Sequence, residues 1–204
     1  MNPPEPAILI PHRDLLGQVL NQAGLLGQGC EIGVQEGKFS EVILQNWHGQ
    51  KLYSLDPWQH FGEKEYLDLA NRDQAAQDLL YENTQKRLAC FGERSVILRQ
   101  TSVKAAEAFT AEQLDFAYID AQHTYEAVAK DMRIWFPKIK PGGILCGDDY
   151  IPDGLYTFGL FGVKRAVDEF AARRNLQVFI SGEVSPDPKI MAFRSWFIVK
   201  SPAS

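Results

Sequence analysis

The sequence predicts an α/β fold in which helices cover both faces of a doubly wound, mostly parallel sheet of seven strands. Five short apolar runs alternate with longer stretches of helical apolar spacing, the pattern of a parallel sheet with crossover helices. Two of the runs, FAYID and GGILCG, are nearly continuously apolar rather than alternating, as expected of strands that are covered on both faces. The last two apolar runs are separated only by a loop, which predicts a C-terminal antiparallel hairpin at the sheet edge.

The predicted elements follow in chain order. The strands are GCEIGV, KLYSLD, SVILRQ, DFAYID and GGILCGD, and then the hairpin strands LQVFIS and SWFIVK. The helices are expected at residues 13–22, 38–47, within 64–90, 103–109, 125–139 and 163–174. Pro141 and the two glycines after it are expected to end the fifth helix and to start the next strand. Residues 1–28 are expected to pack on the core as an N-terminal segment and helix, and residues 29–204 to form the functional domain.

Composition limits the classes of partner and the compartment. With 204 residues and 45% hydrophobic content, one substantial core is expected. The net charge of -5 predicts no broad basic face and therefore no nucleic-acid partner, so a small molecule is the expected ligand. Cys30, Cys90 and Cys146 are odd in number and far apart, which favours free thiols in a reducing compartment. No apolar run approaches the roughly 20 residues of a membrane span, so the protein is expected to be cytoplasmic, with no membrane partner.

The stretch CEIGVQEGKFS joins the first predicted strand to a helix and carries Glu31, Gly33 and Gly37. Glycines at this point let a ligand approach the backbone and the free amides of a helix start. An acid beside a helix start suits a zwitterion, such as the amino and carboxylate ends of a methionine. Gln35 and Glu36 stand where a GxGxxG motif would need glycine, which argues against NAD. A tight strand-to-helix turn without any ligand is the alternative.

Polar residues also close the second and third predicted strands. Asp56 ends the second strand, where its carboxylate could accept hydrogen bonds from both hydroxyls of a ribose, or could cap the turn before Pro57. Thr101 and Ser102 follow the third strand, where they could reach an adenine edge or form a helix N-cap.

Together these motifs resemble the S-adenosylmethionine-dependent methyltransferases of the Rossmann-like class. The resemblance rests on ExGxxxG after a strand, an acid ending the second strand and KPGG before the fifth, and it runs from about Gly29 to the end of the chain. The catechol-type O-methyltransferases also lack the middle glycine, which is Gln35 here. The resemblance implies S-adenosylmethionine as cofactor and a methyltransferase domain over residues 29–204. Carried over by position, Glu31, Gly33 and Gly37 would hold the methionine part and Asp56 the ribose. Thr101, Ser102 and Asp120 complete the expected cofactor-binding residues.

Three carboxylates follow the fourth and fifth predicted strands, in YIDAQH and CGDDY. Adjacent strands lie about 4.8 Å apart, so Asp120, Asp148 and Asp149 are expected to converge. Like charges this close are costly without a cation, and an oxygen-only ligand set favours Mg²⁺ or another divalent ion. The alternative is that one acid of the pair caps a turn and the other faces solvent. The same positions are metal ligands in the catechol-type and macrocin-like enzymes, and DDY followed by GVKRAVDEF is similar to the latter.

The expected reaction is therefore methyl transfer to a hydroxyl of a small molecule, a sugar or phenolic diol, assisted by the ion. Asp120 and His123 are the expected catalytic residues, with His123 as the base. Gln122 departs from the macrocin-like pattern, which has an aspartate there, and the alternative for His123 is a surface or metal-supporting role. The rival functions are a metal-independent methyltransferase of the same fold, a non-catalytic protein that binds an adenosyl ligand, and a dinucleotide oxidoreductase.

Two further segments are candidates for enclosing the substrate. Residues 150–162 mix aromatics with three glycines, and their wall is expected to consist of Tyr150, Tyr156, Phe158 and Phe161. Buried packing of these aromatics is the alternative. The long helix within 64–90 and the N-terminal helix permit a role in enclosure or in a homodimer contact. The four tryptophans are expected in the core or at an interface rather than against a cofactor.

Overall fold

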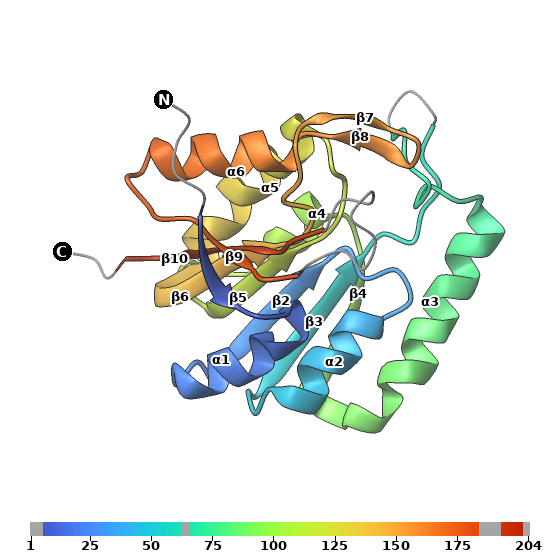
Figure 1. Cartoon of the computed structure of the whole chain (residues 1–204). Coiled ribbons are helices and arrows are strands. Elements are labelled where there is room, and N and C mark those ends of the chain that lie inside the picture. Colours follow the sequence, from blue (N-terminus) through green and yellow to red (C-terminus); the bar gives the residue numbers. More distant parts are fainter. Residues whose placement is uncertain (1–5, 63–65, 184–192, 202–204) are drawn as a thin grey trace.

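The structure, a computed structural model, describes residues 6–62, 66–183 and 193–201. An eight-stranded sheet forms the centre of this part of the chain (Figure 1). In spatial order its strands are β1 (Ala7–Ile10), β9 (Phe179–Ser181), β10 (Trp196–Val199), β6 (Ile139–Gly147), β5 (Leu114–Ile119), β2 (Gln28–Ile32), β3 (Lys51–Asp56) and β4 (Ser95–Arg99).

The strand directions confirm the doubly wound, mostly parallel sheet. The strands from β2 to β6 run parallel to one another. Only β10 runs antiparallel, to β6 on one side and to β9 on the other. The strand order reverses at β2, which lies between β3 and β5. In sheets of this kind ligands bind beyond the carboxyl ends of the strands at such a reversal.

The predicted count of seven strands is wrong, because β1 adds an eighth by pairing in parallel with β9. The pair β9 and β10 is antiparallel as predicted, but it does not end the sheet. β10 lies between β6 and β9, and β1 covers the outer side of β9. Part of the connection between β9 and β10, residues 184–192, lies outside the described residues.

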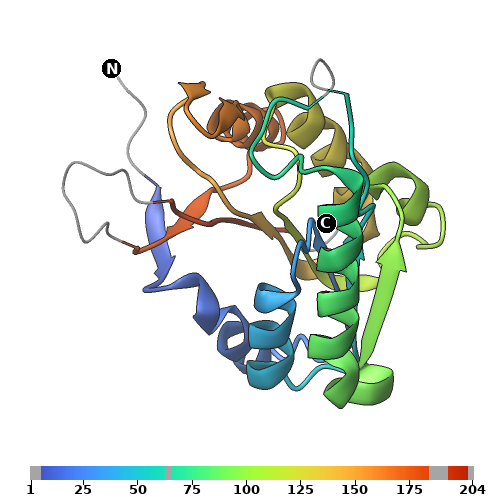
Figure 2. The same ribbon diagram turned by 90° about the vertical axis from the view of Figure 1, so that its right-hand side faces the viewer.

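Helices cover both faces of the sheet (Figures 1 and 2). One face carries α1 (Leu16–Gln22), α2 (Lys38–Asn46) and α3 (Gln74–Leu88); the other carries α4 (Ser102–Ala106), α5 (Tyr125–Trp135) and α6 (Val163–Ala172). Short 3₁₀ turns extend three of these helices: η1 (Arg13–Leu15), η2 (Ala89–Arg94) and η3 (Phe136–Lys138).

The core consists of two apolar layers separated by the sheet. All six residues of β5 are buried. Phe116 and Tyr118 join the layer under α1 and α2, and Ala117 and Ile119 join the layer under α5 and α6. Burying one large apolar side chain contributes about 1.5–3 kcal/mol. Trp47, Trp58, Trp135 and Trp196 are all fully buried, as expected of core residues.

The helix predicted at 125–139 ends earlier, at Trp135. Pro137 follows in η3, and because proline lacks a backbone N–H it cannot continue the hydrogen-bonded ladder of a helix. Pro141 and the two glycines after it lie inside β6 and do not separate the two elements. The long helix predicted within 64–90 is α3, which starts after Asp73, whose side chain accepts a hydrogen bond from the amide of Ala76.

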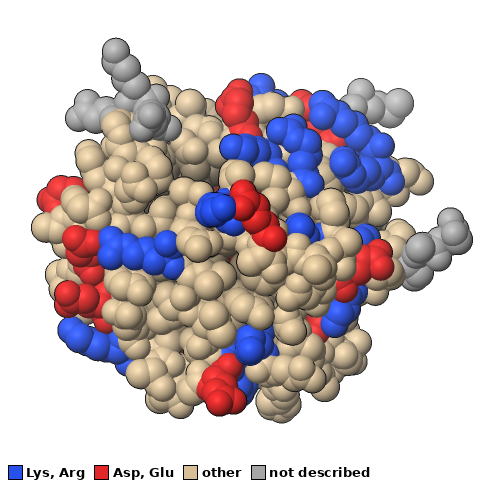
Figure 3. Space-filling model, turned by 180° about the vertical axis from the view of Figure 1, so that it is seen from behind, with Lys and Arg blue, Asp and Glu red and all other residues tan. Residues whose placement is uncertain are grey.

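The segment at 150–162 contains a two-stranded hairpin, β7 (Gly154–Tyr156) and β8 (Gly159–Phe161), rather than only a loop. It lies at the top of Figure 1, beyond the carboxyl ends of the central strands. Among the described residues, no helix is long and apolar enough to cross a membrane. On the face seen in Figure 3, basic and acidic side chains are interspersed, and a group of Lys and Arg lies at the upper right.

Candidate active site

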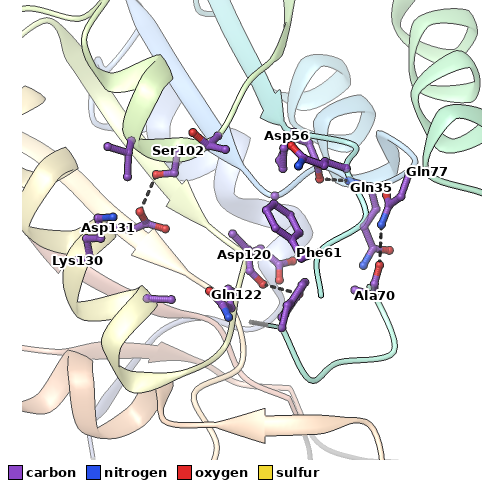
Figure 4. Close-up of a pocket in the computed structure, with 18 residues that line it drawn as sticks. Gln35, Asp56, Phe61, Ala70, Gln77, Ser102, Asp120, Gln122, Lys130 and Asp131 are labelled. Atoms are coloured by element: carbon purple, nitrogen blue, oxygen red, sulfur yellow. Dashed lines mark hydrogen bonds between the residues drawn. The ribbon is translucent and has the colours of Figure 1, made fainter. Parts of the chain in front are cut away.

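A cavity of about 730 Å³ opens at the carboxyl ends of β2, β3, β4 and β5, on both sides of the strand reversal. This volume is typical of a site for a small ligand. Figure 4 shows Asp56 and Gln35 on one side, Ser102 and Asp131 on the other, and Asp120 between them. The wall has three parts, which are the residues at or just after the ends of these four strands, one face of α5, and the segment between β3 and α3 with the start of α3. The first two parts are Gly33, Gln35, Asp56, Pro57, Thr101, Ser102, Val103, Asp120, Ala121, Gln122, Ala127, Lys130 and Asp131, and the third is Gln59, Phe61, Tyr66, Ala70 and Gln77.

The glycine loop brings the end of β2 against the end of β5. Gly33 has φ +89°, and a Cβ at this position would lie 1.9 Å from the carbonyl oxygen of Asp120. Gly37, at φ +73°, is the N-cap of α2. Gly33 lines the cavity, whereas Gly37 is not among the lining residues. The tight turn therefore accounts for both glycines, and at Gly33 it also leaves backbone facing the cavity.

Asp56 lines the cavity and holds the glycine loop. One carboxylate oxygen accepts hydrogen bonds from the amides of Val34 at 2.9 Å and Gln35 at 3.0 Å, and the other accepts from the amide of Trp58 at 2.7 Å. Burial raises the pKa of Asp56, although these three amides oppose the shift. A carboxylate has about four acceptor sites, so three hydrogen bonds leave capacity for a ligand hydroxyl.

Glu31 is buried behind the cavity and is not part of its wall. Its carboxyl accepts a hydrogen bond from Ser40 in the first turns of α2, and Ser40 also pairs with Ser54 at 2.8 Å. Burial raises the pKa of Glu31 to about 8, against the opposing effect of the Ser40 hydrogen bond. Through Ser40, Glu31 connects β2 to α2.

Thr101 and Ser102 line the cavity at the end of β4. Thr101 caps α4 by accepting from the amide of Lys104, which is the cap predicted as the alternative. Ser102 donates to Asp131 Oδ1 at 2.6 Å and accepts from Trp135 Nε1 at 2.8 Å.

Asp131 is a wall residue that the sequence reading missed. It is only 7% exposed, yet it lines the cavity from α5. Burial raises its pKa to about 6, while the Ser102 hydrogen bond lowers it. The available signal was an acid on the apolar face of an amphipathic helix, which does not by itself identify a cavity.

The acids at the ends of β5 and β6 meet around His123. His123 Nε2 lies 3.0 Å from Asp149 Oδ2 and 3.9 Å from Asp120 Oδ1. Asp120, His123 and Asp149 each offer one ligand atom, and these atoms all lie within 4.8 Å of one another. Asp120 is also part of the cavity wall, so this cluster borders the cavity.

His123 is fixed from three directions. Its Nδ1 lies 2.7 Å from Asp68 Oδ2, in the segment between β3 and α3, and its ring stacks on Phe161 of β8 at 4.5 Å. Burial alone would lower the pKa of His123, but the carboxylates of Asp120, Asp149 and Asp68 around it outweigh burial and raise the pKa to about 12. His123 is therefore a cation among carboxylates. Sequence reasoning missed Asp68, because 55 residues separate it from His123.

Asp148, the third acid expected in the metal site, faces a different partner. Its carboxylate pairs with the guanidinium of Arg13 and accepts from Ser195 Oγ at 3.1 Å. The same guanidinium nitrogen lies 3.8 Å from Asp120 Oδ2. Arg13 was also missed by sequence reasoning, since it precedes Asp148 by 135 residues. Asp148 is not among the residues whose ligand atoms come together.

The side chains of this cluster fit part of the ligand set of a divalent ion. Asp120 and Asp149 supply oxygen and His123 supplies nitrogen. Metal-bound histidines usually give their second ring nitrogen to a carboxylate, the relation in which Asp68 stands to His123. A mixed oxygen and nitrogen set suits Mn²⁺ or another transition metal better than Mg²⁺, which prefers oxygen alone.

The aromatics of residues 150–162 pack mainly on one another and on the core. Tyr150 and Phe161 are buried in the layer that holds α5 and α6. Tyr156 stacks on Phe158 at 5.2 Å. None of the four aromatics is among the residues of the cavity wall. The hairpin instead holds the segment before α3, because the amide of Leu69 donates to the carbonyl of Phe158 at 3.1 Å.

Fold, cavity and acid cluster together define a Rossmann-like enzyme domain with a small-molecule site. Residues 30–150 match the protein family described as "Methyltransferase domain". This match covers more than half of the chain, which therefore belongs to that family, and the predicted relationship to S-adenosylmethionine-dependent methyltransferases is confirmed. No curated protein matches the sequence.

Solved structures with the same fold include three methyltransferases of low sequence identity. The O-methyltransferase from Bacillus cereus in complex with SAH has a TM-score of 0.62 and 16% identity, over 92% of this chain and 80% of that chain. The O-methyltransferase TomG from Streptomyces achromogenes, involved in tomaymycin synthesis and in complex with SAM, has a TM-score of 0.63 and 15% identity, over 97% and 83%. The 1,6-didemethyltoxoflavin-N1-methyltransferase from Burkholderia thailandensis, with bound S-adenosylhomocysteine, has a TM-score of 0.58 and 12% identity, over 93% and 77%.

Proposed function

We propose that this chain transfers the methyl group of S-adenosylmethionine to a hydroxyl of a small molecule. The position of Asp120 carries this proposal. Asp120 lines the cavity that suits the donor and also belongs to the cluster with His123 and Asp149. A donor in the cavity and an acceptor at the cluster would therefore meet beside one side chain, which is the proximity that transfer needs.

In this proposal the cavity wall holds the donor, which supplies a methyl group activated on a sulfonium. The backbone at Gly33, with Gly37 at the helix start and Glu31 behind it, would hold the methionine part. Asp56 has accepting capacity left for the ribose hydroxyls. Thr101 and Ser102, with Asp131 beside them, form the end of the cavity proposed for adenine.

The finer part of the proposal is a divalent ion next to the acceptor. A bound ion would lower the pKa of the acceptor hydroxyl. The ligand set expected from sequence, Asp120, Asp148 and Asp149, stays a prediction, and the geometry favours His123 in place of Asp148. The proposed acceptor is a sugar or phenolic diol, whose two hydroxyls would give the ion two oxygens.

A second candidate function is the same transfer without a metal. The observation that favours it is the presence of Arg13 and His123 as cations among Asp120, Asp148 and Asp149. In this case the proton leaving the acceptor oxygen would be received by the hydrogen-bonded pair of His123 and Asp149, whose proton affinity belongs to the pair rather than to either residue. The proposed base His123 would then act through this pair.

The remaining proposals concern the cellular location and the binding partners of the protein. Cys30 and Cys146 are buried free thiols and Cys90 is an exposed one, which supports the proposed cytoplasmic location. A homodimer stays a prediction, as does the absence of nucleic-acid and membrane partners.

The experiment is a transfer assay with the purified chain, S-adenosylmethionine and a panel of phenolic and sugar diols. Formation of S-adenosylhomocysteine together with an O-methylated product is expected, with loss of activity in EDTA and recovery with Mn²⁺ or Mg²⁺. Activity that survives EDTA would select the metal-free candidate. Binding of S-adenosylhomocysteine without any turnover would instead indicate a non-catalytic binding protein.

A further inference from the structure

An arginine from the N-terminal segment lies among the acids of the candidate ion site. β1 adds to the sheet beside β9, and η1 then places Arg13 over the ends of the central strands. The guanidinium contacts Asp148 Oδ2 directly and lies 3.8 Å from Asp120 Oδ2. Two further contacts hold Arg13 in place: its amide donates to Glu183 Oε1 at 2.7 Å, and its guanidinium lies 4.9 Å from the ring centre of Phe39.

The pairing divides the carboxylates into two groups. Asp148 is 9% exposed, and its side chain is engaged by Arg13 and by Ser195. Asp149 turns toward His123. Among the described residues, Arg13 is the only lysine or arginine that forms an ion pair with Asp120, Asp148 or Asp149. A guanidinium is always charged and cannot release its proton to make room for a metal.

We propose that Arg13 is the protein's own counter-ion for Asp148, and that this pairing keeps Asp148 out of the divalent-ion site. The ligands left are Asp120, His123 and Asp149. A fixed positive charge close to Asp120 opposes a second cation, and the loss of one carboxylate removes an oxygen ligand. Arg13 is thus a specificity-determining residue: it lowers affinity for Mg²⁺ and leaves a mixed set that suits Mn²⁺.

This inference deepens the proposed function, because it concerns the ion at the same site, but it can be tested by ion binding alone. The probes are MnCl₂ and MgCl₂, titrated calorimetrically into the full chain without cofactor or acceptor. Arg13→Gln is expected to tighten Mg²⁺ binding at least about tenfold, a difference of about 1.4 kcal/mol. Arg13→Lys keeps the positive charge and is expected to remain close to the unaltered chain.

Two controls show where a gain in affinity comes from. Arg165→Gln removes an exposed arginine that pairs with Asp153 and forms no ion pair with Asp120, Asp148 or Asp149, and it should change nothing. Adding Asp148→Asn to Arg13→Gln should abolish the gain, because Asp148 is the carboxylate that Arg13 releases. As a single substitution, Asp148→Asn should leave the Mn²⁺ affinity within about threefold of that of the unaltered chain. The single substitution Asp149→Asn should abolish Mn²⁺ binding.

The outcomes separate this inference from the proposed function. If the unaltered chain binds no ion but Arg13→Gln does, Arg13 excludes the ion altogether, which would overturn the claim that Asp120, His123 and Asp149 form an Mn²⁺ site beside it. Equal affinities in Arg13→Gln and the unaltered chain would overturn it, including the case in which neither binds an ion. Should Arg13→Gln fail to fold, loss of Mn²⁺ binding on Asp148→Asn alone would overturn it as well. If the ion affinities of the variants change as expected but no methyl transfer is detected, only the proposed function is contradicted.

Discussion

At the scale of single residues, Asp56 combines a structural and a proposed binding role. Its two oxygens accept three backbone amides that fix the glycine loop and the turn at Trp58. The remaining acceptor capacity faces the cavity. A ligand hydroxyl there would form a charge-assisted hydrogen bond, which contributes about 1.5–3 kcal/mol.

Asp56→Ala is therefore expected to weaken S-adenosylmethionine binding at least about tenfold, as measured by calorimetry. Asp56→Asn keeps one acceptor oxygen and should lose less. Glu93→Ala changes an exposed acid and serves as control. Unchanged affinity in Asp56→Ala would remove Asp56 from the cofactor site.

Asp131 makes a separate prediction about stability and pH. Its pKa in the folded protein is raised, mainly by burial, to about 6, whereas in the unfolded chain it is about 3.9. Protonation therefore favours the folded state, and this contribution is present at low pH and is lost as the pH rises from about 4 to about 6.

Asp131→Asn, which is isosteric and can still accept from Ser102, should raise the free energy of unfolding at pH 7.5 by about 2 kcal/mol. At pH 4 the gain should be close to zero. Urea unfolding at both pH values measures the difference. An equal effect at the two pH values would show that Asp131 does not titrate as the structure indicates.

At the scale of elements, the connection between β2 and α2 depends on the close approach of two strand ends. Gly33 has both a left-handed φ and a neighbour, the carbonyl oxygen of Asp120, where its Cβ would be. Gly24 has a similar φ, +70°, but no atom within 4 Å of its would-be Cβ. A substitution at Gly24 therefore reports on backbone strain alone, whereas a substitution at Gly33 adds a steric clash to that strain.

Gly24→Ala should cost about 1 kcal/mol, the penalty for a side chain in this backbone region. Gly33→Ala should cost clearly more, about 3 kcal/mol or above, because β2 and β5 must move apart. Chemical denaturation of both variants gives the comparison. Similar losses at the two sites would mean that the ends of β2 and β5 are not packed as closely as described.

The success of sequence reasoning at this scale follows the length of the apolar runs in the sequence. The five central strands are apolar runs of five residues or more between helical stretches, and each was predicted. β1, β7 and β8 have four residues or fewer and were not predicted. β1 pairs with β9 from the other end of the chain, whereas β7 and β8 pair with each other. β9 and β10 are equally short, but they lie in the longer apolar runs LQVFIS and SWFIVK and were predicted. The end of α5 was misplaced because the glycines after Pro141 gave a stronger signal than Pro137.

In the candidate site, too, some residues could be predicted from the sequence and others could not. Residues at strand ends, such as Asp56, Thr101 and Asp120, could be predicted because parallel strands end at one edge of the sheet. Arg13 and Asp68 could not, because each reaches the acid cluster through tertiary structure, from 135 and 55 residues away. Long-range side-chain pairing leaves no periodic signal in the sequence, so the pairing of Asp148 with Arg13 and of His123 with Asp68 was not foreseen.

At the scale of the whole molecule, the topology places two chemically different surfaces side by side. The cavity lies over the strand reversal at β2, and the acid cluster lies over β5 and β6. Asp120, at the end of β5, belongs to both. Segments distant in sequence surround this point: η1, the segment before α3 and the hairpin of β7 and β8.

The most direct measurement is a difference electron-density map from crystals soaked with S-adenosylhomocysteine and Mn²⁺. We expect the ligand to lie in the cavity between Asp56 and Ser102, with its sulfur toward Asp120. A single anomalous peak for Mn²⁺ should be bounded by Asp120, His123 and Asp149. An empty cavity with S-adenosylhomocysteine bound elsewhere on the molecule would contradict the assignment of this cavity as the donor site.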